Sequence, residues 1–229
     1  MLFGGTGMYD AAVITAIYDG YDTLKPVLSQ AGLNVDWVLV TDDPYMVDVG
    51  ESLGWRVALK PRPGVHPNRA AKRPKFLPWE YTDAHESVWV DGSFRVLSAD
   101  FVREALRHAD PIAQFRHPWR DCLYAEARTV SAIRKYESQI GIAEKQSAAY
   151  ADAQHPEHWG LWATGVIARR HVPGVVRLGE RWLEEVERWT FQDQISQPFV
   201  LREMGLRPAE FPGSHLANGW MQYEGSGRH

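Results

Sequence analysis

Residues 87–96, "SVWVDGSFRV", combine a short apolar run with a polar turn. The β-branched and aromatic run Val88–Val90 is typical of a buried β-strand. It ends at Asp91, Gly92 and Ser93. A strand fixes the position of the carboxylate at its end, and glycine lets the backbone turn sharply and approach a ligand closely. The stretch therefore predicts a buried strand that presents a carboxylate to a binding site, although Asp-Gly is also a common turn pair.

Short β-rich runs alternate with longer helix-compatible segments along the rest of the chain. This order predicts an α/β sandwich with a largely parallel central sheet flanked by helices. In open α/β sheets, ligands collect outside the carboxyl ends of the strands, so we expect the polar loops after the strands to share one crevice. The other expected strands lie at 13–17, 35–44, 55–61, 111–118 and 160–170, with helices near 178–190 and 193–204.

Length and composition restrict the class of protein. A chain of 229 residues, 45% of them hydrophobic, can bury a substantial core. We expect a single domain over 1–229 with a C-terminal tail at 207–229, of which 211–229 is loop-like. A net charge of -4 argues against binding nucleic acid through overall positive charge. The single cysteine, Cys122, excludes an intrachain disulfide and a cysteine zinc site. The first apolar stretch is too short for a membrane span, so the expected location is cytoplasmic.

The segment 56–79 carries seven Lys or Arg residues and no Asp or Glu. A basic segment beside acidic loops is what a metal-bound diphosphate needs, since cations bind phosphate oxygens and carboxylates bind the metal. A solvated basic loop explains the same charges equally well.

Three further groups could carry chemistry. Asp193 and Gln194 lie where a helix is expected to begin, so the carboxylate could cap the helix or face a reacting sugar as a base or as a stabiliser of positive charge. His117, Arg120 and Glu126 cluster after an expected strand and could bind an acceptor hydroxyl or form a structural group. His215, late in the chain, could complete a metal site or lie exposed in a loop.

Seven segments taken together resemble one family. They are "VITAIYDGYDTL", "DWVLVTDDP", "RAAKRPKFLPW", "SVWVDGSFRV", "FRHPWRDCLYAEA", "GLWATGVIARRH" and "FQDQISQPFVL". In this order and approximate spacing they are similar to the glycosyltransferase-like domain of plant proteins linked to mucilage and turgor regulation, which has bacterial and viral relatives. The similarity spans about residues 12–206.

The resemblance implies a GT-A type nucleotide-binding sandwich and transfer of a sugar from a nucleotide-sugar donor. It implies that the donor pocket is lined after the first two strands, that cations approach the diphosphate, that the Asp91 turn corresponds to the Asp-x-Asp element, and that Asp193 and Gln194 lie at the reaction centre. The residues that the resemblance assigns to donor binding are Tyr18, Asp19, Tyr21, Asp22, Asp42, Asp43, Arg69, Arg73, Lys75, Asp91, Gly92 and Ser93.

One departure from the family pattern affects the metal. Ser93 stands where the general element has its second aspartate. We therefore expect a divalent metal, Mn²⁺ or Mg²⁺, to be held chiefly by Asp91, the diphosphate and His215.

The leading hypothesis is metal-assisted transfer from a nucleotide-diphosphate sugar, with a UDP-sugar as the family-level donor. The acceptor stays open among a protein hydroxyl, a glycan and a modified nucleic-acid base, and so do inversion or retention and the oligomeric state. One rival is a glycoside hydrolase that uses Asp193 and Glu126 as its carboxylate pair. A second is a non-enzymatic module that binds DNA or another polyanion through the segment 56–75.

Overall fold

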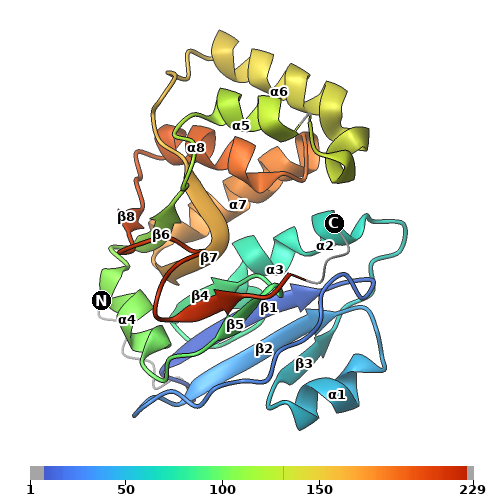
Figure 1. Cartoon of the computed structure of the whole chain (residues 1–229), viewed down its shortest axis with the longest axis vertical. Coiled ribbons are helices and arrows are strands. Elements are labelled where there is room, and N and C mark those ends of the chain that lie inside the picture. Colours follow the sequence, from blue (N-terminus) through green and yellow to red (C-terminus); the bar gives the residue numbers. More distant parts are fainter. Residues whose placement is uncertain (1–7, 131, 226–229) are drawn as a thin grey trace.

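The computed structural model describes residues 8–130 and 132–225, and its main feature is a twisted central sheet (Figure 1). In this part of the chain the sheet has seven strands in the order β3-β2-β1-β4-β7-β6-β8. All neighbours pair in parallel except β7, which is antiparallel to both β4 and β6. The strands are β1 (Ala11–Ile17), β2 (Val35–Thr41), β3 (Arg56–Leu59), β4 (Glu86–Val90), β6 (Ile112–Arg116), β7 (Trp162–Arg170) and β8 (Ala209–Glu210).

Helices cover both faces of the sheet. One face carries α3, α7 and α8, with α5 and α6 packed outside α8, and the other face carries α4 (Figure 1). The helices are α1 (Met46–Ser52), α2 (Pro67–Ala70), α3 (Lys72–Phe76), α4 (Phe101–His108), α5 (Leu123–Val130), α6 (Ile140–Asp152), α7 (Pro173–Arg188) and α8 (Asp193–Glu203), with 3₁₀ turns at Pro78–Glu80 and Arg134–Gln139.

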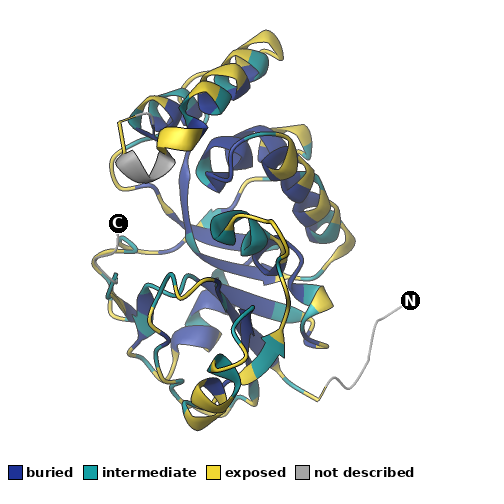
Figure 2. Ribbon diagram, turned by 90° about the vertical axis from the view of Figure 1, so that its right-hand side faces the viewer, coloured by how far each residue is buried: buried dark blue, intermediate teal, exposed yellow. Residues whose placement is uncertain are grey.

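The central strands are apolar because both of their faces are buried (Figure 2). In β1, Ala12 and Ile14 join the core under α3, α7 and α8, while Ala11 and Val13 join the core under α4. A strand covered on both faces has a continuous apolar run in place of alternation, as "AAVITAI" does.

The fold class expected from the sequence is confirmed: a mixed α/β sandwich with a mostly parallel sheet flanked by helices. Each expected strand is present, with bounds that differ by a few residues from those read from the sequence. The reversed strand is β7, whose direction the sequence pattern does not encode. Within the described residues, no helix has the length and apolarity needed to cross a membrane.

The expectation of a loop-like stretch over 211–229 was wrong in part. Just before this stretch, β8 extends the main sheet beside β6; within it, β9 (Met221–Tyr223) pairs antiparallel with β5 (Phe94–Val96) in a second small sheet. Phe211 and Met221 supply the reason, because both bury their side chains in the core under α4. The apolar residues of this stretch are separated by Gly, Ser, Asn and other polar residues and form no run longer than two, which is too short to indicate a strand. Residues 226–229 of the tail lie outside the described part.

Candidate functional site

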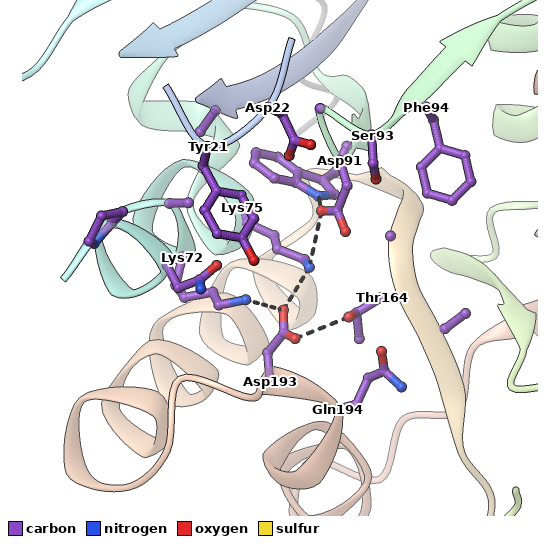
Figure 3. Close-up of a pocket in the computed structure, with 18 of the residues that line it drawn as sticks. Tyr21, Asp22, Lys72, Lys75, Asp91, Ser93, Phe94, Thr164, Asp193 and Gln194 are labelled. Atoms are coloured by element: carbon purple, nitrogen blue, oxygen red, sulfur yellow. Dashed lines mark hydrogen bonds and ion pairs between the residues drawn. The ribbon is translucent and has the colours of Figure 1, made fainter. Parts of the chain in front are cut away.

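A cavity of about 250 Å³ opens at the edge of the sheet where β1 and β4 end and β7 begins (Figure 3). We call it the strand-end pocket. Its walls come from the loops after β1 and β4, from α2 and α3, from the start of α8 and from the tail. Among the residues selected from the sequence, those that line it are Tyr18, Tyr21, Asp22, Lys75, Asp91, Gly92, Ser93, Asp193, Gln194 and His215.

Two carboxylates and two lysines form the centre of the pocket. The Nζ of Lys75 lies 2.7 Å from Oδ2 of Asp193 and 3.4 Å from Oδ1 of Asp91. The Nζ of Lys72 lies 3.1 Å from the same oxygen of Asp193. The side chains of Lys75 and Asp193 are only 3% and 4% exposed. Their charges are therefore shielded from water, and each is stabilised mainly by the other.

The ion pairs set the protonation of the buried groups. Burial alone would raise the pKa of Asp193, but the ammonium groups of Lys72 and Lys75 outweigh it and lower the pKa to about 2. Burial alone would lower the pKa of Lys75, but Asp193 and Asp91 outweigh it and raise the pKa above its ordinary value. Both Asp193 and Lys75 are therefore charged at neutral pH.

Asp193 is the first residue of α8, yet it does not cap the helix. No side chain caps the amides at this end of α8. The Oδ1 of Asp193 instead accepts a hydrogen bond from the hydroxyl of Thr164 on β7 at 3.1 Å, and Oδ2 faces the two lysines. The carboxylate therefore binds Thr164 and the two lysines and does not cap the helix, which was one of the two roles expected from the sequence.

Asp91 ends β4 and points into the pocket with its side chain 39% exposed. Its Oδ1 accepts a hydrogen bond from the indole N–H of Trp89 at 2.6 Å, which fixes the carboxylate next to Lys75. On β7, Gly165 leaves room for this arrangement, because a Cβ there would lie 2.9 Å from the ring of Phe94 and 3.3 Å from Oδ2 of Asp91.

Gly92 matters because it has no side chain. It is not among the glycines with positive φ, so no left-handed turn requires it. A Cβ at this position would lie 3.0 Å from Cβ of Asp22 and 3.1 Å from Ile17. The glycine therefore lets the loop after β1 approach the end of β4, which brings Asp22 to the same side of the pocket as Asp91 (Figure 3).

The donor atoms available to a metal are few. Within the described residues, no group of three or more His, Cys, Asp or Glu side chains is gathered for a metal ion. Two groups have atoms that could bind a metal ion. They are the Asp91 carboxylate and the Nδ1 of His215, which is buried without a hydrogen-bond partner. Burial lowers the pKa of His215 while Asp91 opposes the shift, so the imidazole is neutral and its nitrogen can bind a metal. The chemistry of these two groups fits a divalent ion, for which they supply only part of the ligands.

Several residues that line the strand-end pocket were not predicted from the sequence. Lys72 could have been found, because Lys72 and Lys75 are three residues apart and so share one face of a helix. No local signal marks Thr164, which lies inside a strand, or Asn68. Tyr223 comes from the tail, and its ring packs edge-on against Phe94, 5.4 Å between centroids.

The acidic residues after the first two strands divide into two groups. Asp22 lines the strand-end pocket, whereas Asp19 and Asp42 bind Arg62, with nitrogen to oxygen distances of 3.0 and 2.6 Å. Asp43 accepts a hydrogen bond from the backbone N–H of Tyr45 in the turn before α1. Asp19, Asp42 and Asp43 thus lie at the expected edge of the sheet but do not line the pocket.

Arg69 and Arg73 face away from the strand-end pocket. They line a second cavity of about 460 Å³, which we call the rear cavity. Although Asn68 and Arg69 are adjacent in α2, Asn68 lines the strand-end pocket and Arg69 lines the rear cavity. Arg69 donates to the carbonyl oxygens of Val186 and Trp189, and Arg73 pairs with Glu80 at 2.6 Å. Both guanidinium groups therefore bind elements of the chain itself.

His117, Arg120 and Glu126, which lie close together in the sequence, also contact one another in the structure. Nε of Arg120 lies 2.5 Å and Nε2 of His117 3.8 Å from Oε2 of Glu126. None of the three lines the pocket, but Glu126 accepts a hydrogen bond from the side chain of Gln192, which does. Burial, then Arg120 and His215, lowers the pKa of His117 to about 4. Through this hydrogen bond the cluster holds Gln192, the residue that precedes α8.

The charges of the basic segment are largely used within the chain. Six of its seven Lys and Arg side chains have partners in the described structure, and only Lys60 stands outside this set. Arg56 binds Asp36, Arg62 binds Asp19 and Asp42, Arg69 binds carbonyl groups, Lys72 and Lys75 bind Asp193, and Arg73 binds Glu80. Little of this charge is left to hold a polyanion.

The fold and the pocket define an α/β protein with an open, polar pocket at the carboxyl ends of its parallel strands. The chain belongs to the family described as TOD1/MUCI70, glycosyltransferase-like domain, whose model matches residues 8–212. The resemblance seen in the sequence is thereby confirmed, and membership supports nucleotide-sugar transfer as the general class of reaction.

Among solved structures, the chain is similar to CMP:2-keto-3-deoxy-manno-octonic acid synthetase complexed with CTP. The two share 15% sequence identity over 88% of this chain and 89% of that chain, with a TM-score of 0.48. A likeness of this degree assigns no activity to this chain. No curated protein matches it.

Proposed function

We propose that the protein transfers a sugar from a nucleotide-diphosphate sugar, with a UDP-sugar as donor, to an acceptor hydroxyl, assisted by a divalent metal. One observation carries the proposal: Lys75 stands between Asp91 and Asp193 in an open pocket at the strand ends. Buried cations beside an accessible carboxylate suit a ligand that is itself a metal-bound anion.

The charge of the pocket supports a metal. Its lining has three carboxylates, Asp22, Asp91 and Asp193, against two ammonium groups, Lys72 and Lys75, which leaves an excess of one negative charge. A diphosphate would add more negative charge, so a divalent cation is needed to balance it. Asp91 and His215 would hold this ion, and a bound Mn²⁺ or Mg²⁺ would neutralise charge on the leaving diphosphate.

The lysines act directly on the donor in this proposal. Lys75 lies between Asp91 and Asp193, and Lys72 lies next to Asp193 (Figure 3). A buried ammonium group stabilises negative charge more strongly than one in water, because the local dielectric is low and the group does not need to reorganise. We assign to them the stabilisation of the departing phosphate oxygen, and to Asp193 and Gln194 the face of the reacting sugar.

The remaining walls would hold the nucleoside. Tyr18, Tyr21 and Asp22 follow β1, and Asn68 faces them from α2. Burial raises the pKa of Tyr21, so its hydroxyl stays protonated and can donate to a ribose or a base. This placement puts the nucleoside beyond Asp91, away from Asp193.

The two rival functions find less support in the geometry. A hydrolase would need Asp193 and Glu126 on one substrate, but the Glu126 side chain is 4% exposed, pairs with Arg120 and does not line the pocket. A polyanion-binding module would need free cations on the surface of the segment 56–75. Six of the seven have partners there, and Lys72 and Lys75 lie inside the pocket, out of reach of a polymer.

Isothermal titration of nucleotide sugars, with Mn²⁺ and with a chelator, tests the proposal. We expect at least one UDP-sugar to bind more tightly with Mn²⁺, and Asp91→Asn to lose that difference. A matched control is Asp48→Asn, a substitution of an exposed aspartate on α1. If the folded protein binds no nucleotide sugar under either condition, the proposed function is wrong.

A further inference from the structure

We infer that the transfer retains the anomeric configuration of the donor sugar, because Asp193 is an ion-pair anchor and no other described side chain of the pocket is placed to act as the base that inversion needs. This inference rests on the proposed function. It goes beyond it by fixing the stereochemical course, which the sequence left open.

Both oxygens of the Asp193 carboxylate already have partners, which use three of its roughly four acceptor positions. Its Oδ2 lies 2.7 Å from Lys75 and 3.1 Å from Lys72, and its Oδ1 accepts the hydroxyl of Thr164 at 3.1 Å. A general base needs a lone pair within about 2.6 to 3.2 Å of the hydroxyl from which it takes the proton. Protonation of Asp193 would also leave two buried ammonium groups facing a neutral acid. The pKa of about 2 agrees with this geometry.

The other acidic groups lie on the wrong side of the pocket. Inversion requires a base on the face of the sugar opposite the leaving phosphate. Figure 3 shows Asp22 and Asp91 together at one side and Asp193 and Gln194 at the other, with Lys75 between them. In the proposed function the diphosphate lies on the Asp91 side, so Asp22 and Asp91 are beside the leaving group.

The remaining side chains near Asp193 do not replace it as a base. Gln194 is an amide and does not accept a proton at neutral pH. Glu126 and His117 do not line the pocket, and Glu126 is already paired with Arg120. His215 lies near Asp91, where the proposed function uses it for the metal.

The step that remains is a substitution on one face of the sugar. The bond from the anomeric carbon to the phosphate oxygen breaks, and its electron pair stays on that oxygen. The acceptor oxygen forms its bond to the anomeric carbon on the same face, and its proton passes to the departing phosphate oxygen, so no protein base is consumed. Lys72 and Lys75 stabilise the phosphate, while Asp193 opposes the positive charge that develops on the sugar.

Proton NMR of the first sugar released from UDP-α-D-glucose and UDP-α-D-galactose tests the inference. Water serves as acceptor, spectra are recorded before mutarotation, and heat-denatured protein gives the spontaneous rate. We expect the α-anomer to appear first, and the β-anomer first would overturn retention while leaving the proposed function intact. If titration shows that no nucleotide sugar binds, the proposed function fails, and retention with it.

Discussion

Asp91 and Asp193 share one cation, the ammonium group of Lys75, which lies 3.4 Å from the first carboxylate and 2.7 Å from the second. The three residues come from the end of β4, from α8 and from α3. The shared cation links the side of the pocket that suits a metal-bound diphosphate to the side that suits a sugar. The proposed function depends on this link, and so do the predictions below.

Removal of the shared cation should destabilise the protein. Lys75→Met would leave the buried Asp193 with Lys72 as its only ammonium partner among the described residues. Breaking a buried ion pair from one side typically costs several kcal/mol, so we expect unfolding free energy to fall by about 3 kcal/mol. Urea denaturation measures it, with Lys60→Met on the exposed surface as control. Equal effects of the two substitutions would contradict the role given to Lys75.

The carboxylate of Asp91 should matter for binding more than for folding. Its side chain is 39% exposed and Asn can still accept the indole N–H of Trp89, so Asp91→Asn should shift the melting temperature by only a few degrees at most. Without the charge, affinity for UDP in the presence of Mn²⁺ should fall at least tenfold. A variant that melts far below the wild type, or that keeps its Mn²⁺-dependent affinity, would show that the carboxylate has a structural role instead.

Stability should depend on pH through Asp193. Its pKa is about 2 in the folded protein, below the ordinary value of 3.8, so ionised Asp193 stabilises the fold above about pH 4. This contribution, about 2 kcal/mol, is lost as pH falls from about 4 to about 2. Urea denaturation of wild type and Asp193→Asn between pH 6 and pH 2 measures it. The difference between the two proteins should be constant above pH 4 and shrink below it; a difference that does not change with pH would exclude the assigned ion pairs.

The space left by Gly165 should be essential. In Gly165→Ala the new methyl group would lie 2.9 Å from the ring of Phe94 and 3.3 Å from Oδ2 of Asp91, so ring or carboxylate must move. We expect a loss of about 1 to 3 kcal/mol in stability and weaker nucleotide binding. In α7, Gly174→Ala is the matched control, because no neighbouring segment comes within 4 Å of the position that its methyl group would take. Equal melting temperatures and affinities for the two variants would refute the steric account.

Much of the fold could be predicted because strands that are buried on both faces of the sheet appear in the sequence as continuous apolar runs. Runs such as Val88–Val90 indicate central strands. The polar residues that follow the parallel strands lie at one edge of the sheet, as expected, whereas those that follow the reversed strand β7 lie at the other edge. The strands of the tail could not be predicted, because β8 and β9 are two and three residues long and depend on tertiary pairing.

The site was harder to predict because a sequence does not show which way a side chain points. Asp22 and Asp42 follow neighbouring strands, yet one lines the pocket and the other binds Arg62. In the same way, Lys72 and Arg73 are adjacent, but a helix turns one toward Asp193 and the other toward Glu80. Spacing could have selected Lys72; the partners of the arginines are set by packing between distant segments.

The decisive measurement for the proposed donor site is a crystal structure of the protein with a nucleotide sugar and Mn²⁺. We expect the diphosphate to lie between Asp91 and the lysine pair, with the metal on Asp91 and His215 and the sugar facing Asp193. A diphosphate bound in the rear cavity, beside Arg69 and Arg73, would contradict it.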